Sequence, residues 1–186
     1  MSVSTSTRTA SHSDAASLPT PTQHGSDLGL LALRWGVGLT MAAHGSQKLF
    51  GWFDGNGLDG TAEFFAGNGY SAAKSMAVVA GLTETLCGLG LVIGLLTPLA
   101  AAGIVGIMLN VIAVEWGGGF FGPAGIEFEL LLLIAAVSLA LAGPGRFAAD
   151  RLLPLPVLRT HRLSHCVAAV TLGAAAAGIV LVTLRS

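Results

Sequence analysis

Five long apolar stretches constrain this sequence more than any other feature. They cover Leu28–Phe50, Ser75–Thr97, Pro98–Glu115, Ile126–Ala142 and about Leu163–Leu184. At a rise of about 1.5 Å per residue, each stretch is roughly long enough, as a helix, to cross a hydrocarbon core of about 30 Å. Inside lipid only helices and closed barrels satisfy all of their backbone hydrogen bonds. The pattern therefore predicts an all-α, polytopic transmembrane helical bundle in contact with a lipid bilayer.

The composition agrees with a membrane protein and excludes several other classes. Charged residues make up 10% of the chain, against about 25% in soluble domains. The formal net charge of -1 excludes a broadly basic surface, so we expect no nucleic-acid partner. The two cysteines are too few for a disulfide framework, and no metal-ligand spacing is present. We therefore expect no metal site.

Changes in composition divide the chain into four segments. Residues 1–27 are rich in Ser, Thr and Ala and lack apolar periodicity, which predicts a disordered N-terminal tail. Residues 28–150 contain the first four apolar stretches and are expected to form a four-helix membrane domain. Residues 151–162 form a basic loop, and residues 163–186 contain an additional transmembrane helix.

The arginines between the fourth and fifth stretches predict the orientation. Residues 143–165 contain four of them: Arg146, Arg151, Arg159 and Arg162. The loop after the third stretch has neither Lys nor Arg, and positively charged short loops stay on the cytoplasmic side. We therefore expect a cytoplasmic N-terminus and an outer loop at Trp52–Tyr70. Within that loop, Thr61–Ala66 is predicted to form a short amphipathic helix in the membrane interface.

Polar residues interrupt or flank the apolar stretches at similar predicted depths. Glu84 lies near the middle of the second stretch, where a carboxylate costs about 2.5–3.5 kcal/mol to insert. His44 and Lys48 are four residues apart in the first stretch and share one helical face. Asn110 lies in the third stretch, and Glu129 lies in the first turn of the fourth. The predicted orientation places all of them in the outer half of the bundle.

Arg34 belongs to the same helical face as His44 and Lys48 but lies nearer the other end of its stretch. With the predicted orientation, Arg34 lies about six residues inside the inner edge of the membrane. At that depth a long side chain can reach the interface. We therefore expect Arg34 to act as a structural anchor at the cytoplasmic surface.

Two interpretations of the outer polar residues remain open. In the first, they tie helices together, with Glu84 paired to Lys48 or His44 and Asn110 donating across helices. Such bonds contribute only about 0.6 kcal/mol each, which is less than the insertion cost of a charge. In the second, they line a pocket in which Glu84 and His44 exchange protons while Lys48 and Asn110 bind carbonyl or anionic oxygens. A quinone or a small anion would suit that mixture of groups.

Four segments resemble the DoxX family of small bacterial membrane proteins. They are AAHGSQKLFGWF at Ala42–Phe53, GLTETLCGLGLVIGLLTPLAA at Gly81–Ala101, FFGPAGIEFELLLL at Phe120–Leu133 and GPGRFAAD at Gly143–Asp150. The resemblance covers about Leu28–Asp150 and implies a four-helix transmembrane core, whereas the fifth span and the N-terminal tail depart from the family pattern. It marks as family-pattern positions His44, Gly45, Gln47, Lys48, Glu84 and Arg146.

The resemblance implies a redox role in a bacterial inner membrane. Relatives called DoxD are subunits of a thiosulfate:quinone oxidoreductase, and other members are linked to redox stress complexes. The leading hypothesis is a quinone-linked or redox-associated subunit, and any enzymatic activity would be that of an oxidoreductase of the thiosulfate:quinone type. Glu84 and His44 are the catalytic candidates. The candidate quinone-binding residues are Lys48, Gln47, Asn110 and Glu129.

Two other functions remain as alternatives. The first is a non-enzymatic membrane scaffold that recruits soluble redox enzymes through the basic segment Arg146–Arg162 on the cytoplasmic side. The second is a small carrier for a metabolite or a lipid. An inverted repeat would favour a carrier, and none is evident among the five spans.

Overall fold

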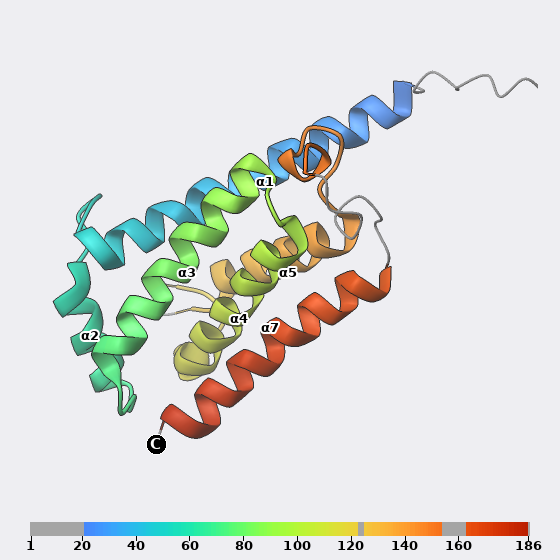
Figure 1. Ribbon diagram of the computed structural model, residues 1–186. Helices are drawn as coiled ribbons and strands as arrows, with labels where there is room; N and C mark the ends of the chain where they lie inside the picture. Colours follow the sequence, from blue (N-terminus) through green and yellow to red (C-terminus); the bar gives the residue numbers. More distant parts are fainter. Residues whose placement is uncertain (1–20, 123–124, 154–162, 186) are drawn as a thin grey trace, which may run out of the picture.

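The computed structural model describes residues 21–122, 125–153 and 163–185. Most of these residues are helical (Figure 1). The helices are α1 (Pro21–Phe50), α2 (Gly57–Gly67), α3 (Ala73–Ile93), α4 (Thr97–Glu115), α5 (Glu127–Ala142) and α7 (Leu163–Leu184), with short 3-10 turns η1 (Trp116–Gly118) and η2 (Ala149–Arg151). Among the described residues, β-pairing is limited to one isolated bridge between Tyr70 and Arg185.

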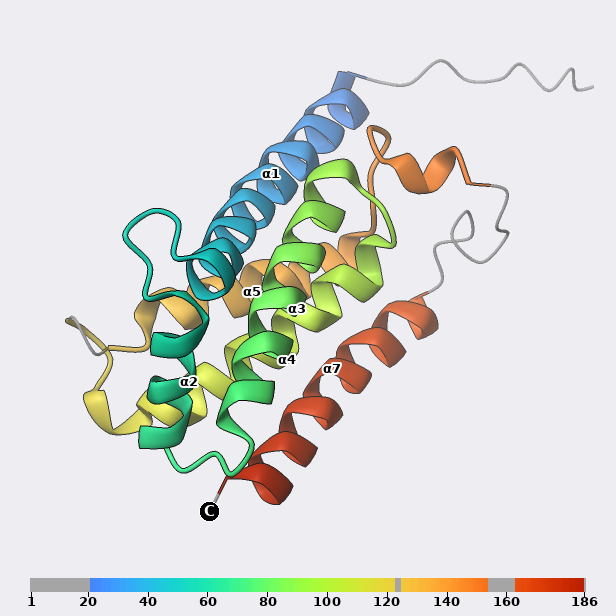
Figure 2. The same cartoon turned by 60° about the vertical axis from the view of Figure 1, so that its left-hand side comes forward.

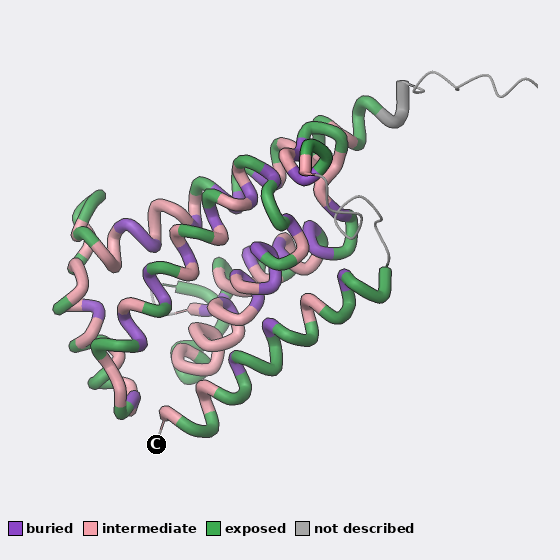
Figure 3. Tube along the Cα trace, viewed as in Figure 1, coloured by how far each residue is buried: buried purple, intermediate pink, exposed green. Residues whose placement is uncertain are grey.

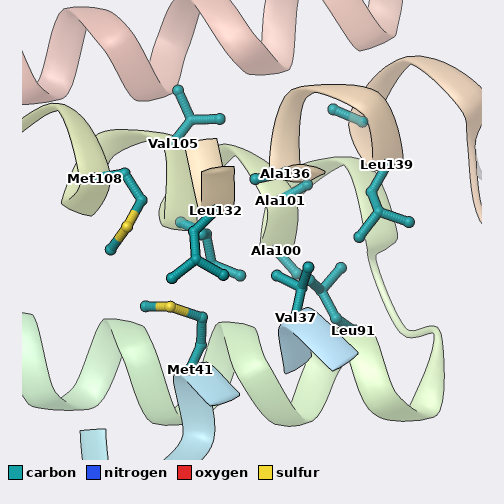
Figure 4. Packing of buried hydrophobic residues seen from close by; sticks show 12 residues of the cluster. Val37, Met41, Leu91, Ala100, Ala101, Val105, Met108, Leu132, Ala136 and Leu139 are labelled. Carbon is teal, nitrogen blue, oxygen red and sulfur yellow. The ribbon is translucent and has the colours of Figure 1, made fainter. Parts of the chain in front are cut away.

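Four of the helices surround a single hydrophobic core. Buried side chains from α1, α3, α4 and α5 form one cluster, which Figure 4 shows from close by. Met41, Met108 and Leu132 converge at one end of this cluster. Helix α7 lies outside it and packs on α4 and α5 (Figures 1 and 2). The predicted all-α bundle, with a four-helix core and a peripheral fifth helix, is confirmed.

Three helices are long and apolar enough to cross a membrane: α3, α4 together with η1, and α7. Of the five spans expected from the sequence, α1 and α5 fall short on these criteria. Helix α5 has only 16 residues, and α1 is less apolar than the other long helices. Most of α7 is exposed along its length, as Figure 3 shows, although it is strongly apolar. Such a surface is suited to contact with lipid.

Helix α1 begins at Pro21, earlier than the Leu28 start expected from hydropathy. Proline suits the first turn of a helix, where its missing N–H costs nothing. In the next turn, Asp27 Oδ1 accepts a hydrogen bond of 3.0 Å from the main-chain N–H of Arg146. Residues 21–27, which were expected to belong to the disordered tail, are therefore part of helix α1. The remainder of that tail, and most of the basic loop 151–162, lie outside the described residues.

Glycines allow α1 and α3 to approach each other closely. A Cβ added to Gly38 or to Gly45 would lie 2.6 Å from a main-chain oxygen of α3. From the other side, a Cβ on Gly88 would lie 2.5 Å from the Ala42 nitrogen. Small residues at such contacts let the backbones of membrane helices pack directly against each other. This contact sets the distance between Lys48 on α1 and Glu84 on α3.

We expect Gly45→Ala to destabilise the bundle by about 1–3 kcal/mol, the usual cost of overpacking a tight contact. Gly36→Ala is the matched control, because nothing lies within 4 Å of a Cβ added at Gly36. That control should be neutral or slightly stabilising, since alanine is favoured over glycine in helices by about 1 kcal/mol. Thermal unfolding of both variants in detergent measures the difference. Equal stability of the two variants would contradict the close α1–α3 contact.

Arg34 is buried, with 1% of its surface exposed, so its guanidinium lies among protein groups and does not extend into solvent as the sequence suggested. Its Nε donates to the Leu91 oxygen at 2.9 Å, and its terminal nitrogens donate to the oxygens of Val92, Phe147 and Pro144. The Arg34 guanidinium therefore links the end of α3 to the loop after α5 through hydrogen bonds. The expectation of a structural anchor is confirmed, but its position is different because these carbonyls offer the partners that lipid lacks.

Asp150 stabilises the start of α4 from the same region. Its carboxylate accepts hydrogen bonds from the main-chain nitrogens of Leu96 at 2.6 Å and Thr97 at 3.0 Å. Leu96 adopts a left-handed conformation with φ 50°. A carboxylate at a helix N-terminus satisfies donors that have no partner within the helix. The α3–α4 turn is thereby fixed at the end of the bundle opposite to α2.

Candidate functional site

A polar cavity of about 390 Å³ lies within the bundle near α2. Side chains from α1, α2, α3, α4, α5 and the α1–α2 loop line it. Its apolar wall includes Met41, Met108 and Leu132, the end of the core cluster seen in Figure 4. The polar side chains that line it are His44, Gln47, Lys48, Asp54, Asn56, Thr61, Glu84, Glu115 and Glu129. Five of the six residues predicted as site residues are therefore brought together here.

Lys48 and Glu84 form an ion pair at the wall of this cavity. Lys48 Nζ donates to Glu84 Oε2 at 2.8 Å. Glu84 is 1% exposed, whereas the Lys48 side chain is 28% exposed. Of the two pairings expected for Glu84, the structure shows the one with Lys48. A buried carboxylate requires such a partner, because an unpaired charge in an apolar interior is strongly unfavourable.

His44 and Glu129 line the same cavity from α1 and α5. The imidazole ring contacts the ring of Phe128, with centroids 6.0 Å apart. Glu129 Oε2 is buried and has no hydrogen-bond partner within the described part of the chain. A buried carboxylate oxygen without a partner is unusual in a folded protein. This oxygen therefore keeps a hydrogen-bonding position that no described protein group fills.

Gln47 holds the loop that covers the cavity. Its Nε2 donates to the main-chain oxygen of Phe53 at 3.1 Å. A Cβ added to Gly55 would lie 2.6 Å from Gln47, so the loop and α1 touch directly. Gln47 therefore has a structural contact and also lines the cavity.

Asn110 lies apart from the other predicted site residues. It lines a second, neighbouring cavity and not the polar one. Its Nδ2 donates to Gly106 in its own helix at 3.0 Å, and its Oδ1 accepts from the Tyr70 hydroxyl at 3.4 Å. The expected donation across helices is therefore wrong, because Asn110 is the acceptor there. Burial raises the pKa of Tyr70, which keeps its hydroxyl protonated as a donor.

The sequence reasoning missed the residues that close the cavity: Asp54, Asn56 and Thr61. Thr61 is buried, and its hydroxyl donates to the Gly57 oxygen at 2.7 Å. Helix α2 packs on α1 and α3 instead of only lying along the membrane interface. Gly51 and Gly57, at φ 71° and φ 67°, turn the chain back over the bundle. The glycines flanking Asp54 were the available signal for this turn.

The groups in the cavity can bind oxygen atoms and hold protons. Lysine, histidine and glutamine side chains supply donors, and the carboxylates supply acceptors or, when protonated, donors. Within the described residues, no cluster of three or more His, Cys, Asp or Glu side chains is arranged to hold a metal ion. Side chains of these types can exchange protons with an oxygen-bearing ligand when they lie within hydrogen-bonding distance of it.

Comparison with known proteins gives matches to one group of membrane proteins. The DoxX family model matches residues 29–116, which contain α2, α3, α4 and most of α1. The chain is 31% identical over 134 residues to an uncharacterized membrane protein of Mycobacterium tuberculosis, covering 66% of this chain and 79% of that relative. It is 32% identical over 130 residues to a Bacillus subtilis protein named "Putative oxidoreductase CatD", covering 67% and 86% respectively. No solved structure matches the chain.

Proposed function

The chain belongs to the DoxX family of membrane proteins, and we propose that it is a redox-associated subunit whose polar cavity binds the head of a quinone. The observation that carries this proposal is the cavity itself. It combines a buried ion pair, an imidazole and an unpartnered carboxylate oxygen in about 390 Å³. Ligand pockets commonly have volumes of about 300–1,000 Å³.

The lining of the cavity fits a quinone better than a small anion. Lys48 is the cation that the sequence suggested for an anion, and it is already paired with Glu84. Glu129 and Glu115 add further carboxylates to the same wall. An anion would meet this negative charge without a free cation among the described lining residues. A neutral ring with carbonyl oxygens avoids that repulsion and also suits the apolar wall.

The chain's own side chains would bind the head and move protons. Lys48 and His44 can donate hydrogen bonds to carbonyl oxygens, and Glu129 can hold a proton at its unpartnered oxygen. A quinone bound there would be the acceptor for two electrons from a partner redox enzyme and for two protons. Glu84 and His44 are the groups that we propose exchange those protons, because both line the cavity and both titrate. Gln47 orders the covering loop.

Two further observations support a redox role. The name of the Bacillus subtilis relative describes an oxidoreductase. The polar groups also lie in a bundle whose helices expose large apolar side chains, which supports a ligand that is soluble in the membrane. We further propose that the protein lies in a bacterial inner membrane with its N-terminus in the cytoplasm, as the loop charges indicate.

Quinone titration of the purified protein in lipid nanodiscs tests the proposal. We expect His44→Ala and Glu129→Leu each to weaken binding by up to about tenfold, because each removes a donor to a quinone carbonyl and such a hydrogen bond contributes about 0.5–1.5 kcal/mol. Lys74→Ala is the control, since the Lys74 side chain is 71% exposed and lines neither cavity. Folded wild type that fails to bind quinone, or cavity variants that bind as the control does, would contradict the proposal.

A further inference from the structure

A second cavity, also of about 390 Å³, lies beside the polar one. Its floor is α4, and its walls are α3 and α7, which lie along either side of α4 in Figure 2. Almost all of its lining is apolar, with Tyr70 and Asn110 at the end near α2. Lining residues such as Val79 and Leu99 are each 52% exposed, so the cavity opens to the outside of the bundle. In a membrane protein, that outside is lipid.

The two cavities meet at the Lys48–Glu84 ion pair. Lys48 and Glu84 line both of them, as do Phe64 and Val111. A molecule with a polar head and an apolar tail could therefore occupy both, with its head beside the ion pair. The polar cavity supplies the hydrogen-bonding groups for such a head, whereas the lining of the second cavity is almost entirely apolar.

Helix α7 supplies one wall of the apolar cavity. It contacts the rest of the bundle at the middle of the helix and at its C-terminal end. A Cβ added to Gly106 would lie 3.1 Å from the Gly173 oxygen, so α4 and α7 touch at mid-helix. At the end of α7, Arg185 donates to the oxygens of Asn68 at 3.2 Å and Ala113 at 3.0 Å. The DoxX family match ends at residue 116, before α7 begins. The wall formed by α7 therefore lies outside the region that the family model matches.

We propose that this apolar cavity binds the first part of the isoprenoid tail of the quinone whose head occupies the polar cavity. The proposal rests on the proposed function and specifies its ligand as a tailed quinone that enters from the bilayer. Burial of the tail between α3 and α7 would hold the head beside Lys48 and Glu84. Helix α7 then determines which tail the chain accepts.

The test compares two probes, a decyl-substituted benzoquinone and the same ring without a tail, in identical nanodiscs. Ala176→Phe places a large ring at the cavity wall, because Ala176 lines the cavity. Ala175→Phe is the matched control, since Ala175 is exposed on the same helix and does not line the cavity. We expect Ala176→Phe to weaken decyl-quinone binding by about tenfold, which corresponds to lost burial of about two methylene groups. Tailless binding should stay unchanged in both variants.

The outcomes separate this inference from the proposed function. If both probes bind and Ala176→Phe leaves the ratio of their affinities as in wild type, the tail lies elsewhere and a lipid chain fills the cavity. That result overturns the inference and leaves the polar cavity as the quinone site. Equal loss in Ala176→Phe and Ala175→Phe also overturns it. If neither probe binds folded wild type, the proposed function fails and the inference fails with it.

Discussion

Arg34→Met is expected to destabilise this protein strongly. Arg34 is the shared donor to four main-chain oxygens, those of Leu91, Val92, Pro144 and Phe147. Two of these oxygens keep another donor, because the Gly94 N–H donates to Leu91 and Trp35 Nε1 donates to Val92, each at 3.2 Å. Each buried acceptor left without a donor costs about 1–3 kcal/mol, so the loss of the bonds to Pro144 and Phe147 is expected to cost about 2–6 kcal/mol. That is a large fraction of the stability of a typical domain.

Chemical unfolding in mild detergent measures this loss. Arg146→Met is the matched control, because the Arg146 side chain is exposed and its hydrogen bond to Asp27 uses the main-chain nitrogen. The control should unfold as wild type does. An Arg34→Met protein as stable as this control would show that the guanidinium does not hold the end of α3 to the loop after α5.

The second large effect is expected at the Lys48–Glu84 ion pair. Removing one partner of a buried pair costs about 3–5 kcal/mol, because the other charge is left buried without compensation. Glu84 is 1% exposed, so Lys48→Met should be strongly destabilising. Replacing both residues together, as Lys48→Met/Glu84→Leu, removes both charges and should recover most of the lost stability. The coupling between the two sites is obtained from a double-mutant cycle.

The chain offers its own control for that cycle. Lys74 and Asp59 form an ion pair at 3.3 Å with side chains that are 71% and 89% exposed. Exposed pairs contribute about 0–1 kcal/mol, so the same cycle at Lys74 and Asp59 should show little coupling. Equal coupling at the buried and exposed pairs would contradict the burial of Glu84 seen here.

Part of the site could be predicted from the sequence because helical geometry alone determines it. His44 and Lys48 share a face because they are four residues apart. Glu84 had to face inward, since lipid provides no partner for a carboxylate. Loop charges and span lengths then set similar depths for these groups, and the structure places them around one cavity.

The rest depended on contacts that periodicity does not encode. Asn110 faces the α3–α7 side of α4 because rotation about the helix axis is set by packing, including the Gly106–Gly173 contact. The α1–α2 loop closes the polar cavity through a close contact at Gly55. Arg34 bonds to carbonyls more than 50 residues away in the sequence, and such partners cannot be chosen from a single apolar stretch.

The central claim, that the polar cavity beside the ion pair binds a quinone head, is tested most directly in the Lys48→Met/Glu84→Leu variant. This variant removes both charged groups from the wall that the two cavities share, and it is expected to keep the helices packed because no uncompensated charge is left buried. In titrations with the tailless quinone, the double variant should bind about tenfold or more weakly than wild type, because it has lost the hydrogen bonds to charged groups. Binding of that ring by the folded double variant with the affinity of wild type would contradict the claim.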